Sequence, residues 1–178
     1  SVVDRLPEIQ YLDGPIKQEV ATVFAEAVPE YFWLARASES HHPPDERGLA
    51  GLWLHTKRVF TAYMMLERTY RSMGLLGPYQ AKCCRAAVLL HDGFKYGLNH
   101  SEQDETAHEY ADGRLSHLPE HTDRSHDVLM ADYLDESTAL PLEVVSAVRS
   151  HGGSPDWYSH SGPKPVQPHE MIVHLADV

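Results

Sequence analysis

Histidines on the apolar faces of several predicted helices constrain the fold of this 178-residue sequence more than any other feature. His55, His126 and His151 each share a helical face with apolar residues three and four positions away. Burying such a face strips the imidazole of water, which is costly unless another group satisfies its nitrogens. We therefore expect a fold that brings these side chains to a common site.

Apolar residues at helical spacing account for most of the chain, and neither an internal repeat nor a strand pattern of any length appears. Prolines and glycines mark the helix ends, as at Pro15, Gly74 and Pro141. An irregular lead-in is expected over residues 1–14. The predicted fold class is all-α, with helices at about 15–28, 30–34, 49–73, 79–90, 122 or 125 to 136, 141–151 and 167–177. Glu67 and Arg71 are predicted to form an exposed ion pair, four residues apart on one helix.

Charge and cysteine content narrow the classes of function. The formal net charge of -11 argues against a non-specific grip on nucleic acid, which needs a basic surface. No apolar run approaches the roughly 20 residues of a membrane span, and no signal-peptide pattern opens the chain. The only cysteines, Cys83 and Cys84, are adjacent on one predicted helix, which excludes a disulfide framework. A cytoplasmic protein without a membrane partner is expected.

A histidine and a carboxylate stand side by side between an apolar run and a glycine. The stretch reads Leu89-Leu90-His91-Asp92-Gly93-Phe94-Lys95. Both side chains are good ligands for a divalent metal, and the preceding helix would deliver them at its C-terminal end. Together with the histidines above and a carboxylate on the last helix, the candidate metal ligands are His55, His91, Asp92, His126, His151 and Asp177.

Imidazole and carboxylate without thiolate is a donor set for Mn, Fe, Co, Ni or Zn. Six ligands exceed what one four-coordinate ion needs and suit two ions bridged by a carboxylate and a hydroxide. A single ion held by the ligands other than His126 and His151, with His126 as a general acid, remains an alternative. His117 and His121 also precede His126, so either is an alternative ligand at that position.

The order His, His-Asp, His, His, Asp resembles the binuclear branch of the HD superfamily of metal-dependent phosphohydrolases. The matching words lie at residues 51–56, 89–95, 150–153 and 174–177, so that the resemblance covers about residues 48–178. It implies a single HD domain over 1–178, a helical bundle with the metals between its helices. In that reading residues 1–47 form an N-terminal helical arm and loop, and 48–178 the metal-binding core. The superfamily usually continues into further helices, which leaves open whether the natural protein extends beyond Val178.

The resemblance implies hydrolysis of a phosphate ester or anhydride, in a nucleotide or a short oligonucleotide. Asp92 would bridge two metals, whose bridging hydroxide attacks phosphorus. Lys95 would be a second catalytic residue that reaches the phosphate or holds Asp92. Arg58 is a candidate phosphate clamp because it lies three residues after His55. The loop pair His41-His42, similar to HD-type 3′–5′ exoribonucleases, would contribute to substrate binding.

Two other functions fit the same residues. Di-iron oxygenases of the myo-inositol oxygenase type have the same six-ligand order, and a metal-stabilised module could bind a nucleotide without turnover. Residues 38–48, 93–121 and 152–168 are the expected pocket walls, where Trp157 and Tyr158 are candidates to stack on a base. Because these ranges carry the least pattern, neither the exact substrate nor the oligomeric state follows from the sequence.

Overall fold

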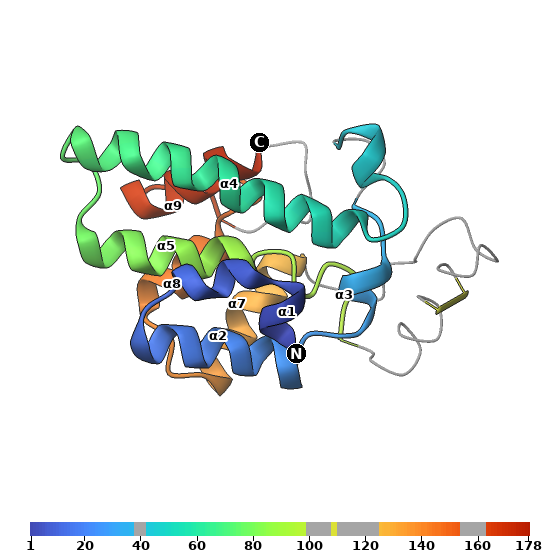
Figure 1. The fold of residues 1–178 in the computed structure, drawn as a ribbon. Coiled ribbons are helices and arrows are strands. Elements are labelled where there is room, and N and C mark those ends of the chain that lie inside the picture. The colour runs from blue at the N-terminus through green and yellow to red at the C-terminus, as the bar shows by residue number, and fades with distance from the viewer. Residues whose placement is uncertain (38–41, 99–107, 110–124, 154–162) are drawn as a thin grey trace.

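The computed structural model describes residues 1–37, 42–98, 108–109, 125–153 and 163–178, and this part of the chain contains helices and no strand. Figure 1 shows α5 in the middle of the bundle, with α4 and α9 on one side and α2, α7 and α8 on the other. The α-helices and 3-10 helices (η) are α1 (Val2–Arg5), η1 (Pro7–Tyr11), α2 (Gly14–Glu26), α3 (Tyr31–Leu34), η2 (Pro44–Glu46), α4 (Gly51–Ser72), α5 (Pro78–Leu90), α7 (His126–Ser137), α8 (Leu142–Arg149) and α9 (Pro168–Asp177). The predicted all-α fold class is confirmed.

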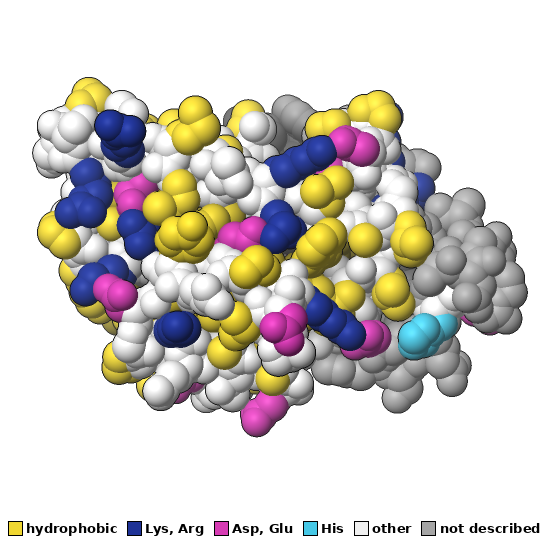
Figure 2. All heavy atoms as spheres, in the orientation of Figure 1, with side chains coloured by type: hydrophobic (Ala, Val, Ile, Leu, Met, Phe, Trp, Pro, Cys, Tyr) yellow, Lys and Arg dark blue, Asp and Glu magenta, His cyan; other side chains and the backbone are white. Residues whose placement is uncertain are grey.

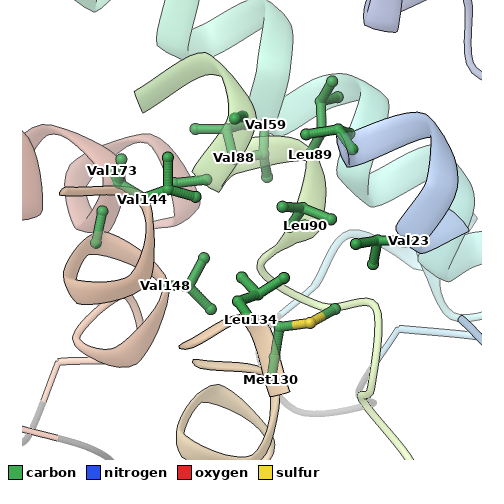
Figure 3. Packing of buried hydrophobic residues seen from close by; sticks show 14 of the residues in the cluster. Val23, Val59, Val88, Leu89, Leu90, Met130, Leu134, Val144, Val148 and Val173 are labelled. Carbon is green, nitrogen blue, oxygen red and sulfur yellow. The ribbon is translucent and has the colours of Figure 1, made fainter. Parts of the chain in front are cut away.

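Helix α5 occupies the centre because most of its circumference is apolar. Pro78 stands in its first turn, and the side chain of Gln80 accepts a hydrogen bond from the Gly77 amide at 3.0 Å. Its buried residues are Ala81, Cys83, Cys84, Ala86, Ala87, Val88, Leu89 and Leu90. A helix with so wide an apolar surface must be covered on several sides. Figure 3 shows side chains of α2, α4, α7, α8 and α9 around its C-terminal half.

The N-terminal segment is more ordered than the predicted irregular lead-in over residues 1–14. Ser1 caps α1, since its hydroxyl accepts a hydrogen bond from the Asp4 amide at 3.4 Å, and Leu6 and Ile9 are fully buried. This prediction was wrong because α1 and η1, with 4 and 5 residues, are too short to display a helical period.

The predicted exposed pair of Glu67 and Arg71 is also wrong. Glu67 is only 4% exposed and bonds across the helix interface to Arg85 of α5. Its Oε1 accepts from Arg85 Nε at 2.9 Å and from the Tyr63 hydroxyl at 3.0 Å, and its Oε2 accepts from Arg85 Nη2 at 2.8 Å. Spacing along one helix could not reveal this partner, because Arg85 comes from the neighbouring helix.

The distribution of charge on the described surface agrees with the acidic composition of the chain. On the face in Figure 2, lysines and arginines are interspersed with acidic and hydrophobic side chains and form no continuous basic stripe. Among the described residues, none of the helices has the length and apolar character needed to cross a bilayer. Cys83 and Cys84 are both free and buried.

Candidate metal centre

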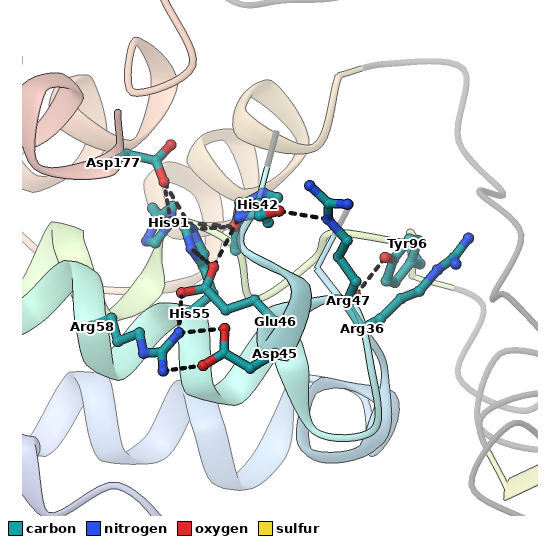
Figure 4. A network of polar contacts seen from close by, with 11 residues as sticks. Arg36, His42, Asp45, Glu46, Arg47, His55, Arg58, His91, Tyr96 and Asp177 are labelled. Carbon is teal, nitrogen blue, oxygen red and sulfur yellow. Dashed lines mark hydrogen bonds and ion pairs between the residues drawn. The ribbon is translucent and has the colours of Figure 1, made fainter. Parts of the chain in front are cut away.

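The six predicted ligands lie together where the C-terminal end of α5 meets four other helices. His55 projects from α4, His91 and Asp92 follow α5, and His151 follows α8. His126 is the first residue of α7 and Asp177 the last residue of α9. Figure 4 shows His55, His91 and Asp177 pointing toward one another from their separate elements. The fold therefore gathers side chains from five helices at one end of the bundle.

Asp92 lies between two pairs of histidines, and each of its carboxylate oxygens faces one pair. Oδ2 is 3.5 Å from His55 Nε2 and 3.2 Å from His91 Nε2. Oδ1 is 3.0 Å from His126 Nε2 and 3.5 Å from His151 Nε2. A single carboxylate thus belongs to two groups of donors, one on each side of it.

Asp177 completes the first of these groups. Its Oδ1 lies 2.9 Å from His55 Nε2 and 3.3 Å from His91 Nε2. The first group therefore consists of His55, His91, Asp92 and Asp177, and the second of Asp92, His126 and His151. Within each group the potential ligand atoms all lie within 4.8 Å of one another, which is close enough to surround one ion.

Two histidines are oriented by the helix ends from which they come. The Nδ1–H groups of His91 and His151 donate to the carbonyls of Val88 and Val148, each at 2.6 Å. Carbonyls in the last turn of a helix lack the regular amide partner four residues later, so they can accept a hydrogen bond from such a side chain. A neutral ring that carries its proton on Nδ1 has its lone pair on Nε2. In both residues Nε2 faces Asp92, at 3.2 Å from Oδ2 for His91 and at 3.5 Å from Oδ1 for His151.

The donor set fits a divalent cation. His91 Nε2 is buried, and although it is near two carboxylates, the described part of the chain offers it no hydrogen bond of acceptable geometry. Burial lowers the pKa of His91, but Asp92 and Asp177 raise it well above its usual value, so this position attracts positive charge. For Asp92, burial acts in the opposite direction and raises the pKa. The charges of His91 and Lys95 and the hydrogen bonds of His126 and His151 outweigh burial and hold this pKa well below its usual value. Ionised carboxylates and imidazole nitrogens without thiolate suit a transition-metal ion.

Of the other predicted site residues, some lie at the metal centre, one is engaged elsewhere, and the rest are outside the described part of the chain. Lys95 is half-buried, and its positive charge acts on Asp92 and His126. The ring of His42 packs edge-on against His55, with centroids 4.3 Å apart. Arg58, predicted to clamp a phosphate, is engaged by the carboxylates of Asp45 and Glu46 instead. The remaining predicted residues, His41, His117, His121, Trp157 and Tyr158, lie outside the described residues, as does much of the predicted pocket wall.

The sequence reasoning missed Glu46. This side chain is 3% exposed, and its Oε2 lies 3.1 Å from the Nδ1 atoms of both His42 and His55. Its residue type and spacing do not separate it from the neighbouring Asp45, whose side chain is exposed. Only the course of the loop that contains η2 turns Glu46 toward the histidines.

Of the comparisons with known proteins, the one with protein families gives a match. The HD domain family matches residues 52–178, a range that includes all six candidate ligands but neither His42 nor Glu46. Comparison with curated proteins and with solved structures gives no match.

Proposed function

Since this chain belongs to the HD-domain family of metal-dependent phosphohydrolases, we propose that it hydrolyses a nucleotide or a short oligonucleotide with two divalent ions. The strongest support comes from the two oxygens of Asp92, which face different histidine pairs. One ion would be held by His55, His91, Asp92 and Asp177, and the other by Asp92, His126 and His151. When bound, two such ions lower the pKa of a shared water and neutralise charge on phosphoryl oxygens.

The protein side chains prepare this site in three ways. His91 and His151 present Nε2 lone pairs, because the carbonyls of Val88 and Val148 hold their Nδ1 protons. Asp92 stays ionised, as its lowered pKa requires, and so keeps both oxygens available as ligands. The helices that carry the ligands bury His91, Asp92 and His151 almost completely, which strengthens their interaction with a cation.

Two side chains beside the donor groups, Lys95 and His42, would line the site of the substrate phosphate. Lys95 places a positive charge beside Asp92 and His126, within the electrostatic range that affects the pKa values of both. His42 is 12% exposed at its side chain and lies against His55, at the edge of the first donor group. Because the chain as a whole carries a net charge of -11, binding of a polyanion depends on the local positive charge of Lys95 and on the ions.

A metal-by-substrate screen tests this function. Purified protein would be incubated with Mn²⁺, Co²⁺, Ni²⁺, Zn²⁺ or Mg²⁺ and with mononucleotides, dinucleoside polyphosphates, cyclic dinucleotides or short oligonucleotides. We expect product release with at least one transition metal, under anaerobic as well as aerobic conditions, and none from an identically purified Asp92→Ala variant. Binding without turnover would favour a nucleotide-binding module. Strict dependence on Fe and O₂ would make the protein an oxygenase.

A further inference from the structure

We propose that Glu46 is a positioning residue of the metal centre, which fixes the tautomer and orientation of His55. This inference rests on the proposed function, since it assigns Glu46 a role in holding the ion of the first donor group. Glu46 lies outside the part of the chain that matches the HD domain. It would act through His55 and would not itself contact the ion.

The contacts of His55 show how Glu46 acts. Glu46 Oε2 lies 3.1 Å from His55 Nδ1, and an ionised carboxylate can only accept a hydrogen bond. Nδ1 must therefore carry the proton, which leaves the lone pair of the neutral ring on Nε2. That atom lies 2.9 Å from Asp177 Oδ1 and 3.5 Å from Asp92 Oδ2. A carboxylate bonded to the far nitrogen also makes the imidazole a more basic ligand.

His55 needs such a partner because of its place in α4. His91 and His151 stand just after helices and bond to carbonyls three residues earlier. His55 is inside the helix Gly51–Ser72, where the preceding carbonyls accept hydrogen bonds from backbone amides one turn later. The acceptor for its Nδ1 proton therefore comes from outside the helix, and Glu46 supplies it.

The buried charge of Glu46 is compensated by a chain of contacts to the surface (Figure 4). Its Oε1 accepts from Arg58 Nη1 at 3.1 Å, and both carboxylate oxygens of Asp45 bond to the same guanidinium. A bidentate contact of this kind orients a guanidinium strongly. Arg58 thus holds the Glu46 carboxylate in place from the exposed side of the network. This role accounts for the contacts of the Arg58 guanidinium with Asp45 and Glu46.

The backbone is also built to let Glu46 approach α4. A Cβ atom at Gly51 would lie 1.9 Å from the carbonyl oxygen of Glu46, so only glycine fits there. Ala50 adopts φ 59°, a left-handed conformation that is unfavourable for a residue with a Cβ atom. The Glu46 carbonyl in turn accepts from the Ala37 amide at 2.9 Å. Strained backbone of this kind persists where surrounding contacts hold it, often at a functional site.

The test measures Mn²⁺ bound per chain against free Mn²⁺, together with the visible absorption of the Co²⁺ form. We expect Glu46→Gln to weaken one of two binding steps by about 10–100-fold, to leave the other unchanged and to alter the Co²⁺ spectrum. Glu67→Gln is the matched control, because Glu67 is also a buried, arginine-paired carboxylate but does not touch the cluster. It should lower thermal stability and change neither the Mn²⁺ isotherm nor the spectrum.

A second variant keeps the test decisive if Glu46→Gln does not fold. Arg58 is 44% exposed at its side chain, so Arg58→Gln should fold and should weaken the same step by a smaller factor. If a folded Glu46→Gln, or Arg58→Gln in its place, has the wild-type isotherm and spectrum, the role of Glu46 is refuted while the proposed function stands. A wild-type protein that binds none of Mn²⁺, Fe²⁺, Co²⁺, Ni²⁺ and Zn²⁺ would refute both.

Discussion

Two buried glutamates lie near opposite ends of α4, and each is paired with an arginine. Glu67, near the C-terminal end, directs both oxygens to Arg85 and one also to Tyr63. Glu46, beside the N-terminal half, directs one oxygen to Arg58 and the other to two imidazoles. The first network is closed, because its charges satisfy one another. The second continues through His55 into a cluster of carboxylates and imidazoles.

This difference separates a stabilising network from a binding site. Buried polar groups stabilise a fold when every member has its partner, and a half-satisfied network is costly. Both carboxylate oxygens of Glu67 are hydrogen-bonded, whereas the cluster keeps the buried His91 Nε2 without a well-formed hydrogen bond among the described residues. An external cation would satisfy the cluster, and nothing further is needed at Glu67. The two ends should therefore respond differently to substitution and to metal.

The largest effect is expected at Asp92, which the two donor groups share. Asp92→Ala should reduce hydrolysis to background and reduce the metal content from two ions per chain to one or none, because both groups lose a ligand. Activity assays and elemental analysis of the purified variant would measure this. Glu67→Gln, assayed well below its melting temperature, should keep wild-type turnover. Full activity in Asp92→Ala would contradict the proposed mechanism.

Removal of metal should affect only the cluster end, and it should lower thermal stability. At an ion concentration of about 100 times the dissociation constant, binding stabilises the folded protein by about 2.7 kcal/mol. In a chain of this length that corresponds to roughly 5–11 °C in melting temperature. Melting curves with a chelator and with Mn²⁺ would measure the shift. The increment should be the same in Glu67→Gln, and a missing increment in wild type would argue against a metal centre.

Substitution of the closed network should reduce stability without touching function. Glu67→Gln removes charged hydrogen bonds to Arg85 and should cost about 2 kcal/mol in the free energy of unfolding. Urea unfolding of the chelated proteins would measure it. In a double-mutant cycle with Arg85→Gln, the second substitution should cost little once the first is present. Additive losses would mean that the two side chains do not act as a pair.

The smallest effect concerns the two thiols on α5, which report on the Glu67 end. Burial raises the pKa of Cys83 to about 11 and that of Cys84 to about 12, so little thiolate exists near neutral pH. Labelling of native protein with a chromogenic disulfide should therefore be slow. Glu67→Gln should speed it modestly, because it removes a carboxylate charge that contributes to the raised pKa of Cys84. If Glu46→Gln accelerated thiol labelling equally, the effect could not be attributed to the Glu67 network.

The sequence predicted the helices well, because long amphipathic segments such as α4 carry a clear period. Sequence-based prediction failed for very short helices and for contacts between side chains that lie far apart in the chain. The helices within residues 1–14 were not predicted, because a segment as short as the 5 residues of η1 shows no helical period. Glu67 was paired with Arg71 on its own helix, because the sequence does not show that Arg85 of α5 lies beside it. Glu46 had no distinguishing signal, since its place depends on the turn before Gly51. The six candidate ligands could be singled out because each stands on an inward face or at a helix end, and the structure places them close together.

The distance along the chain between His55 and Asp177 sets the order in which the cluster can be completed. They are 122 residues apart, although His55 Nε2 and Asp177 Oδ1 lie only 2.9 Å apart. A ribosome makes every residue of the Asp92, His126 and His151 group before α9 is translated. The first donor group is complete only after α9 has been synthesised and has packed against α4 and α5. The residues of the Asp92, His126 and His151 group therefore all precede α9 in the chain, whereas the first donor group needs the last helix for its fourth member.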